Sequence, residues 1–529
     1  MPLKYSVPKY ADGIKQDTQT AFKGFDARLS ACDGAIRDMR NMSGDEYPVA
    51  STRAGRKTLL DIGSPNGIFC RDGIYYAASD GLYELRDGES VKLGSLSDSV
   101  KCFASLGAYI VILPDKAYYN RLTGEFGSLE AEWSGTASFA DGTFAGEAAE
   151  ACRIVTTGAA FPFNAGDAVT ISGADNDANN MTVIIREISD DKKSLGFYEH
   201  SFDNADAQNL TLKRSVPDMD FIFENDNRLW GCRGDEIYAS KPGDIFNWNV
   251  FDGLASDSYA VTVGSGGDFT AGISYLGYPI FFKEDKVYKV YGSKPSDYQV
   301  MSSASMGVAS GSDRSLAIAG EVLYYHSRAG IMAYSGGIPQ CVSSVFGNAV
   351  YTDAVGGSDG IRYYVSLLGS DGVRTLMCYD TKSNQWFRED ELSVIGFCSD
   401  ESRLIALTEK VSGTERSGAL TALRGEAPDE GNFSSMIEFA DFIEDSPNKK
   451  STSKLMLRVE LDPGSTLTVQ FSSDDGEYTN ARTLTAPEKR SYYLPVMIRR
   501  CDHFRIRLKG VGGWRLYSLT REYSAGSQI

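Results

Sequence analysis

Residues 218–252 read DMDFIFENDNRLWGCRGDEIYASKPGDIFNWNVFD. This stretch predicts three short strands, at Phe221–Phe223, Arg228–Cys232 and Glu236–Ser240, because apolar and aromatic residues alternate there between turn-forming residues. A polar turn at Glu224–Asn227, a Gly-Asp turn and a Pro-Gly-Asp turn separate and end them. Short strands joined by tight turns are typical of an antiparallel meander.

The same order of turn and strand recurs along the chain on both sides of this stretch. The clearest markers are Asp-Gly pairs, which are strong hairpin signals. Further units of this kind occupy residues 67–95, 101–129, 268–293, 313–337, 360–390 and 394–423. Repetition at this spacing is typical of a β-propeller, in which each blade is a four-stranded sheet, and we expect six to eight blades.

Changes in residue pattern predict five parts of an all-β chain. An N-terminal arm precedes a propeller that is interrupted by an inserted, small β-barrel-like domain, and a β-sandwich or a final oversized blade ends the chain. We expect the arm to lie on the body of the protein or to reach a neighbouring subunit. The predicted ranges are 1–60 for the arm, 61–129 and 216–430 for the propeller, 130–215 for the insertion and 435–529 for the C-terminal part.

Composition restricts the classes of function. The 529 residues include 71 acidic and 53 basic ones, so the formal net charge is −18, and no long basic run is available to neutralise phosphates. Tight sequence-specific binding of nucleic acid is therefore not expected, although an acidic wall would suit DNA that passes without sticking. No apolar signal core or long apolar run occurs, which predicts neither Sec export nor membrane insertion.

Local motifs for catalysis or metal binding are missing from the sequence. Nine cysteines are spread singly without a CxxC pair, so we expect reduced core residues and neither a disulfide framework nor a thiolate metal site. The three histidines, His200, His326 and His503, lie far apart and are interpreted as structural. No GxSxG or GK[ST] motif occurs. The sequence therefore predicts no enzyme and no cofactor.

Two acidic turns contain oxygen ligands of the kind that Ca²⁺ prefers. They are Asp175–Asn180 (DNDANN) and Ser472–Glu477 (SSDDGE), and neither has the spacing of an EF-hand loop. Ordinary turn chemistry is the favoured interpretation of both, so we predict no metal residues.

Three stretches together resemble a family of bacteriophage proteins, the tail-nozzle and head-stabilisation (tail tubular) structural proteins of short-tailed phages. They are FKGFDARLSACDGAIRDMRNMSGDEYPVASTRAGR (22–56), DNRLWGCRGDEIYASKPGDIFNWNVFDG (226–253) followed by LGYPIFFKEDKVYKVYG (276–292), and RRCDHFRIRLKGVGGWRLYSLTREYSAGS (499–527). The resemblance covers most of the chain outside residues 130–215. The positions that match its motif are Arg228, Leu229, Trp230, Ser240, Pro242, Gly243 and Asp244.

The resemblance implies a subunit of a homo-oligomeric ring that lines the DNA exit channel of a virion tail. Its partners would be further copies of itself, the portal, an adaptor or other tail proteins, and viral DNA would pass through without specific binding. The chain would be made in the host cytoplasm and end in the virion. On this interpretation the motif residues are structural and form no ligand site.

Two other classes of function remain open. The first is a β-rich tail fibre or adhesin that binds or depolymerises host surface glycans, although such tailspikes are usually β-helices with short-period strands. The second is a host enzyme or a secreted propeller lectin, which the missing signal peptide and the unpaired cysteines disfavour.

Overall fold

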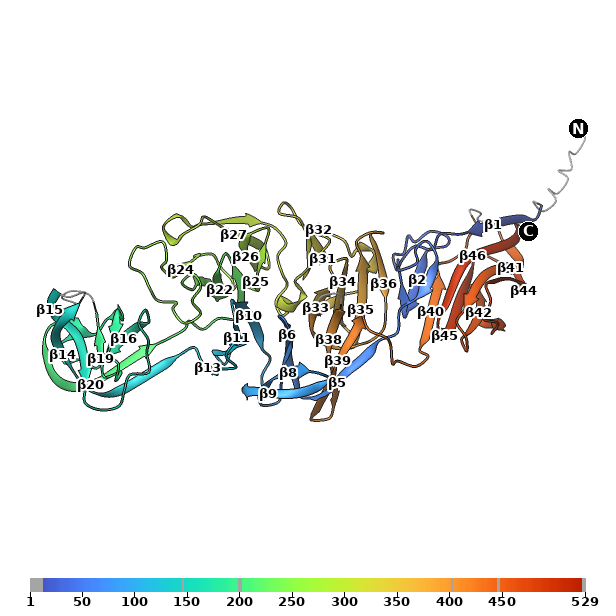
Figure 1. Cartoon of the computed structure of the whole chain (residues 1–529). Coiled ribbons are helices and arrows are strands. Elements are labelled where there is room, and N and C mark those ends of the chain that lie inside the picture. Colours follow the sequence, from blue (N-terminus) through green and yellow to red (C-terminus); the bar gives the residue numbers. More distant parts are fainter. Residues whose placement is uncertain (1–12, 145–146, 198–201, 401–402, 445–447, 526–529) are drawn as a thin grey trace, which may run out of the picture. The chain divides into compact units, whose positions relative to one another are not determined.

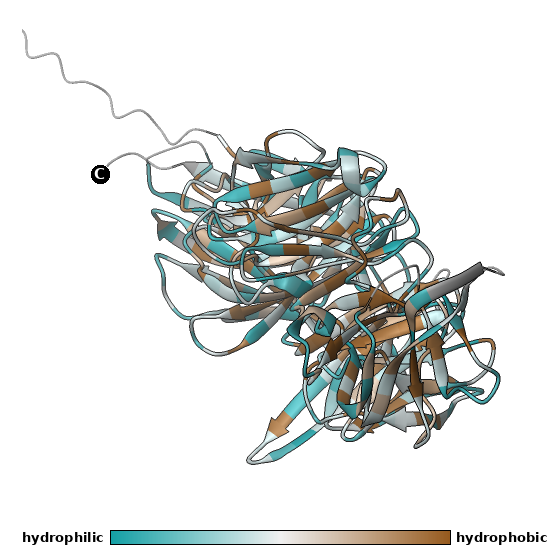
Figure 2. Ribbon diagram, turned by 90° about the vertical axis from the view of Figure 1, so that its left-hand side faces the viewer, coloured by the Kyte–Doolittle hydropathy of each residue, from teal (hydrophilic) through white to brown (hydrophobic). Residues whose placement is uncertain are grey.

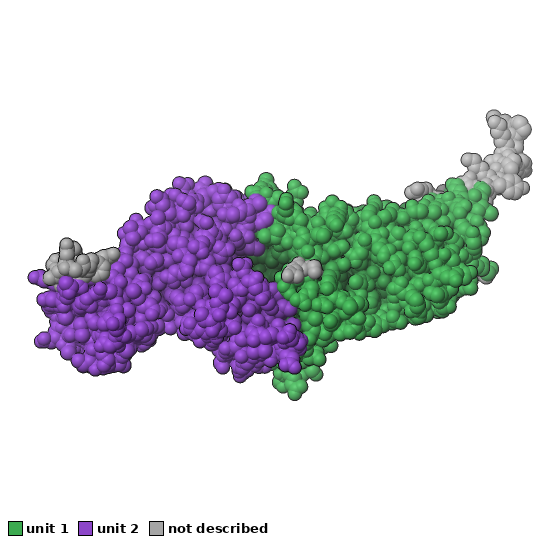
Figure 3. Space-filling model, in the orientation of Figure 1, with its two compact units in different colours: residues 1–65, 309–529 green, residues 66–308 purple. Residues whose placement is uncertain are grey.

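A computed structural model describes residues 13–144, 147–197, 202–400, 403–444 and 448–525. The chain forms antiparallel sheets throughout, and the predicted fold class of a β-propeller with an inserted β domain and a C-terminal β-sandwich is confirmed. The strands are labelled in Figure 1. The chain divides into two compact units, residues 1–65 with 309–529 and residues 66–308, which are coloured separately in Figure 3.

Unit 2 contains four four-stranded sheets, each an antiparallel meander in which neighbouring strands follow one another along the chain. This is the arrangement that the Asp-Gly and Pro-Gly turns predict. The strands are β6 (Pro65–Cys70), β7 (Ile74–Ala78), β8 (Gly81–Arg86), β9 (Glu89–Ser95); β10 (Cys102–Leu106), β11 (Tyr109–Leu113), β12 (Ala117–Asn120), β13 (Phe126–Ser128); β21 (Phe221–Asn225), β22 (Arg228–Arg233), β23 (Glu236–Ala239), β24 (Tyr259–Thr262); and β25 (Ala271–Tyr275), β26 (Tyr278–Lys283), β27 (Lys286–Tyr291), β28 (Gln299–Ala304).

Unit 1 contains three more sheets of this type, so the total of seven lies within the predicted range of six to eight. The last of them takes its fourth strand, β5, from the N-terminal part of the chain, and Leu60 pairs with Leu420 there. The strands are β29 (Ala317–Ala319), β30 (Val322–Ser327), β31 (Gly330–Tyr334), β32 (Gln340–Cys341); β33 (Tyr351–Ser358), β34 (Arg362–Gly369), β35 (Arg374–Asp380), β36 (Gln385–Arg388); and β37 (Val394–Asp400), β38 (Arg403–Ser412), β39 (Glu415–Arg424) with β5 (Lys57–Gly63).

The C-terminal part is a sandwich of two sheets, which decides between the two architectures expected for it. One sheet has the order β3-β4-β46-β41-β44 with β1 on β46, and the other has the order β2-β40-β45-β42-β43. Its strands are β40 (Ser434–Phe439), β41 (Lys450–Leu461), β42 (Thr466–Ser473), β43 (Thr479–Leu484), β44 (Arg490–Cys501), β45 (Phe504–Val511) and β46 (Trp514–Ala525). Apolar residues of both sheets, including the fully buried Trp514 and Leu457, form a single core between them.

The segment interpreted from the sequence as an arm is built into this sandwich. Its strands are β1 (Lys15–Gln19), β2 (Ile36–Arg40), β3 (Met42–Ser43) and β4 (Ala50–Thr52). The buried side chains of Phe22, Ile36, Met39 and Met42 belong to the sandwich core. Sequence periodicity missed these strands because they are short and because β1, β2 and β4 pair with strands more than 390 residues later, as the pairing of Met39 with Ile437 shows. Residues 1–12 lie outside the described part of the chain.

The insertion forms one seven-stranded sheet of order β17-β16-β20-β14-β15-β19-β18 around its own core. The sheet is open, since its end strands are paired on one side only in the residues that the structure describes. The strands are β14 (Ala131–Phe144), β15 (Glu147–Thr156), β16 (Ala168–Ser172), β17 (Thr182–Ile184), β18 (Glu187–Ile188), β19 (Ser194–Gly196) and β20 (Ala205–Arg214). Ala131 and Arg214 are partners in the ladder, so the domain leaves and rejoins unit 2 at adjacent points.

Aromatic side chains join neighbouring sheets within each unit. Trp230 packs among residues of β22, β23, β26 and β27, and its ring centroid lies 5.3 Å from that of Tyr298. Trp386 packs on Phe346 and Tyr379, with ring centroids 4.8 and 4.9 Å away. Figure 2 shows hydrophobic and hydrophilic residues alternating along many of the strands, as expected for sheets with one face packed and the other exposed.

The cysteines correct part of the prediction made for them. Four cysteines outside disulfides are buried, Cys152, Cys232, Cys378 and Cys501, whereas Cys32 and Cys341 are exposed. Cys70 and Cys398 each belong to a disulfide, so the expectation of reduced side chains is wrong for these two. Single cysteines far apart in the sequence carry no information on tertiary neighbours. Across the described ranges, no helix is both long and apolar enough to cross a membrane.

Candidate functional site

The residues of the family motif lie together in the sheet β21–β24 and the turn that follows β23. Arg228 is 3% exposed, and its guanidinium donates to the carbonyls of Ser240 (2.8 Å) and Ala255 (2.9 Å). Leu229 and Ser240 are fully buried; the Leu229 N–H donates to Ser240 Oγ (3.0 Å), and the Ser240 N–H donates to the Leu229 carbonyl (2.9 Å). These contacts fix the turn to the strand.

The rest of the motif shapes the turn itself. Gly243 has a φ of +71°, a conformation that favours glycine, and its N–H donates to the carbonyl of Asn227 at 2.7 Å. Asp244 accepts from the N–H of Phe246 and from the side-chain amide of Asn247, both at 2.7 Å. Pro242 is exposed at the preceding position. These contacts brace the turn. The polar groups of the motif make hydrogen bonds within the protein, so the motif is structural.

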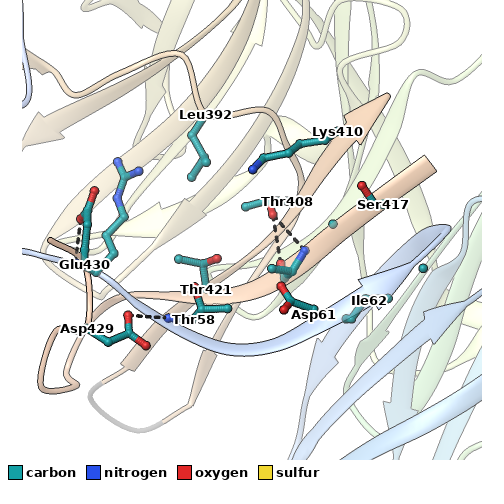
Figure 4. Close-up of a pocket in the computed structure, with 14 residues that line it drawn as sticks. Thr58, Asp61, Ile62, Leu392, Thr408, Lys410, Ser417, Thr421, Asp429 and Glu430 are labelled. Atoms are coloured by element: carbon teal, nitrogen blue, oxygen red, sulfur yellow. Dashed lines mark hydrogen bonds between the residues drawn. The ribbon is translucent and has the colours of Figure 1, made fainter. Parts of the chain in front are cut away.

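A hollow in unit 1 is the strongest candidate for a binding site. It has a volume of about 840 Å³ and lies on one face of the sheet β37-β38-β39-β5 (Figure 4). Strand β5 contributes Thr58 and Asp61, and β38 contributes Thr408 and Lys410. The remaining lining residues with polar side chains are Arg56, Ser417, Thr421, Asp429 and Glu430.

One wall of the hollow is held by a network of arginines and carboxylates. Arg53 makes a bidentate pair with Glu430 (2.7 and 2.8 Å), and its guanidinium carbon lies 4.1 Å from the centre of the Phe433 ring. Arg56 donates to Glu389 (2.7 Å) and Asp390 (2.7 Å). Such forked pairs fix both partners in one orientation.

The same network sets the charges in this wall. Burial acts to raise the pKa of Glu430, but the hydrogen bond and charge of Arg53 outweigh it and hold this pKa below its usual value. Burial acts to lower the pKa of Arg56, and the carboxylates of Glu389 and Asp390 outweigh it, so its pKa is raised. Glu430 and Arg56 are therefore both ionised at neutral pH.

The floor of the hollow is anchored by backbone contacts. The Thr58 N–H donates to Asp429 Oδ1 (3.2 Å), and the Arg56 N–H donates to Glu430 Oε2 (3.0 Å). Thr408 Oγ1 donates to the carbonyl of Ala419 (3.2 Å) across the ladder. Asp61, Lys410 and Ser417 are exposed lining residues whose side chains make no hydrogen bond within the described part of the chain (Figure 4). Hydroxyl, carboxylate and ammonium groups at one concave surface suit a ligand rich in hydroxyl groups.

Sequence reasoning did not find this hollow. Its residues come from 56–63 and 392–430, and only the pairing of β5 with β39 brings the two segments together. No local motif marks either segment, so the signal exists only at the level of the tertiary fold.

The predicted structural histidines and acidic turns occupy different parts of the chain. His326 is buried, and its Nδ1 lies 2.9 Å from Ser312 Oγ, whereas His503 lies beside Asp502 in the sandwich; His200 is outside the described residues. Asn176 caps a short 3₁₀ turn at Asp177–Asn179. In the described ranges no three residues of the His, Cys, Asp or Glu type are grouped so that they could hold a metal ion.

Comparisons with known proteins give structural matches only. No family model matches the sequence, and no curated protein matches it. An exo-β-1,3-galactanase of Phanerochaete chrysosporium bound to galactose is 11% identical with a TM-score of 0.22, over 57% of this chain and 94% of the other. A Trypanosoma rangeli sialidase bound to sialic acid is 9% identical with a TM-score of 0.25, over 97% of this chain and 96% of the other. Likeness at this level assigns neither activity nor ligand.

The expectation that the chain is not an enzyme is nevertheless corrected. The matched structures include glycoside hydrolases, and the absence of local motifs had been the whole basis of that expectation. The inference was wrong in principle as well, because glycoside hydrolysis needs two carboxyl groups that the fold brings together from distant segments. Missing nucleophile elbows and phosphate loops therefore do not exclude this class of chemistry.

Proposed function

We propose that the chain is a structural protein of a bacteriophage tail. The observation that supports this most directly is the role of the residues resembling the phage family: Arg228, Leu229 and Ser240 form the buried frame of one sheet and its turn. A motif whose residues are buried in the frame of a sheet indicates a shared scaffold and not a shared ligand. The proposed partners are further copies of the chain, the portal, an adaptor or other tail proteins.

Within the tail, the proposed place is a ring around the exit path of the viral DNA. The support is electrostatic: a formal net charge of −18 gives a surface that repels a polyanion, so that DNA passes without adhering. The chain would be made in the host cytoplasm and join the virion during assembly.

A density map of the assembled particle tests this proposal. The expected result is the chain in several symmetric copies around the channel axis. A position away from the axis, or absence of the chain from purified particles as measured by mass spectrometry, would contradict it.

A second candidate function is recognition of host surface glycans by the hollow in unit 1. The specific observation is the exposed set Asp61, Lys410 and Ser417 in a concavity of about 840 Å³. Sugars are bound through such polar groups, and a tail protein that meets the cell surface has access to them.

Calorimetric titration of the full chain with purified host envelope polysaccharide tests this second candidate. Asp61→Asn and Lys410→Ala should each weaken binding by about tenfold, the usual cost of losing one hydrogen-bonding partner of a charged group. Asp87→Asn serves as the matched control, since Asp87 is an exposed residue in unit 2. Equal binding by all variants, or no binding by the parent chain, would rule the hollow out as a glycan site.

A further inference from the structure

The outer face of the sandwich carries exposed apolar side chains beside an unpaired sheet edge. Strand β44 ends the sheet β3-β4-β46-β41-β44, and no described strand pairs with its other side. On its outward face Tyr493 is 62% exposed and Met497 is 83% exposed. Tyr493 is the ladder partner of Met456 on β41, so the apolar surface extends to a second strand. An unpaired strand edge beside large exposed apolar residues marks a surface at which another protein chain binds.

This surface, the β44 face, is also basic. Residues 489–500 read KRSYYLPVMIRR and contain four basic and no acidic residues. Lys489 lies over the ring of Tyr517 at 3.3 Å from its centre, and the Tyr517 hydroxyl donates to Glu460 at 2.7 Å. Lys454 lies 5.9 Å from the centre of the Tyr493 ring and pairs with Glu522 at 3.6 Å. Arg458 is exposed next to them on β41 and makes no ion pair within the described part of the chain. Tyrosine, methionine and arginine are the residues enriched where proteins bind one another.

Charge is distributed unevenly between the C-terminal part and the inserted domain. Residues 435–529 contain 14 basic and 12 acidic residues, a net charge of +2. Residues 130–215, the inserted domain, contain 6 basic and 14 acidic residues, a net charge of −8. The chain thus has a basic part and an acidic part. Opposite charges on two different patches favour association of one copy with the next.

The acidic residues of the inserted domain gather at one place. Segments 172–180 and 202–209 contain four acidic and no basic residues. The Asn179 side chain ties the two segments together, because its amide donates to the Asp203 carbonyl and its oxygen accepts from the Asp203 N–H, both at 2.9 Å. Asp175, Asp177, Asp203 and Asp206 are all exposed. We call this set the acidic end of the inserted domain.

We propose that the β44 face of one copy binds the acidic end of the inserted domain of a second copy. This inference rests on the proposed tail function and names the surfaces through which one subunit holds the next. A protein partner fits better than DNA, because the face combines its charge with exposed Tyr and Met side chains and a free strand edge, and because the chain as a whole repels a polyanion. Since the two surfaces differ, the contact is heterologous and can continue from copy to copy.

Sedimentation of the full chain over a range of concentrations tests the contact. The parent chain should self-associate, and added salt should weaken the association. Arg458→Glu with Lys489→Glu lowers the charge of the β44 face by four units, and Asp175→Lys with Asp206→Lys neutralises the four carboxylates of the acidic end. All four residues are exposed, so both variants should melt like the parent. Each variant alone should associate at least about tenfold more weakly.

Mixing the two variants gives the sharper result. Each keeps the surface that the other has lost, so the mixture should form a one-to-one complex that does not grow further. A monomeric parent chain, unchanged association of either variant, or no complex in the mixture would overturn the inference. Binding of duplex DNA by the parent that the β44-face variant loses would assign this surface to nucleic acid instead. Absence of the chain from virions would contradict the tail function while leaving the measured self-association intact.

Discussion

The guanidinium of Arg228 donates to the backbone carbonyl of Ser240 at 2.8 Å, and this bond joins strand β22 to the turn after β23. Arg228→Ala would leave the carbonyls of Ser240, Ala255 and Asp257 without their donor. A buried polar group left unpaired costs about 1–3 kcal/mol, so we expect the free energy of unfolding of unit 2 to fall by about 3 kcal/mol or more. Chemical denaturation measures this loss.

Arg233→Ala is the matched control on the same strand. Its side chain is 54% exposed and pairs with Asp218 at 2.9 Å on the surface. An exposed pair of this kind contributes less than about 1 kcal/mol. Similar losses from both substitutions would mean that Arg228 does not brace the turn.

Trp230→Ala should destabilise the packing between the sheets β21–β24 and β25–β28. Trp230 is 1% exposed and contacts the rings of Tyr259, Phe281 and Tyr298. Truncating a buried aromatic side chain typically costs about 3–5 kcal/mol, which thermal melting readily detects. Phe251→Ala, at a residue that is 59% exposed, should change stability by less than about 1 kcal/mol. A Trp230 variant that melts like the parent would contradict the packing role.

Removal of the inserted domain should leave the remaining sheets folded. Replacing residues 131–213 with a short Gly/Ser linker is feasible, because Ala131 and Arg214 are ladder partners. The inserted domain has its own core, so few apolar contacts are lost with it. We expect the β signature in circular dichroism and one cooperative melting transition to persist; global unfolding of the deletion variant would show that the domain is integral to unit 2.

The sequence was informative wherever structure depends on nearby residues. Turn and strand patterns placed β21, β22 and β23 within one or two residues of their observed bounds, because alternation and Gly-containing turns act locally. The same patterns predicted the interruption by the insertion, whose strands β14 and β20 begin and end within one residue of the expected range 130–215.

Long-range pairing was beyond the reach of the sequence. Strand β5 completes a sheet with β39, and β2 pairs with β40, although in both cases about 360 to 400 residues separate the partners. The hollow depends on the first of these pairings, so neither Asp61 nor Lys410 was a candidate residue. Register between such distant strands is set by the packed core and not by local propensity.

Buried His326 should make the stability of unit 1 depend on pH near neutrality. Burial lowers the pKa of His326, while the charge of Asp353 partly opposes this, so the folded protein holds the ring neutral. In the unfolded chain the pKa returns to about 6.5, and the unfolded state then binds the proton more readily. Stability is therefore fully present above about pH 6.5 and is lost as the pH falls through the folded value.

His326→Gln removes this titration and keeps a polar partner for Ser312, whose Oγ lies 2.9 Å from His326 Nδ1. Denaturation midpoints of the parent and the variant, measured from pH 8 to pH 5, should show a smaller decline for the variant over the acidic half of the range. The comparison isolates one group because all carboxylates are common to both proteins. Parallel pH profiles would mean that the ring takes up its proton in the folded state as readily as in the unfolded one, and that Ser312 and the surrounding strands tolerate the charge.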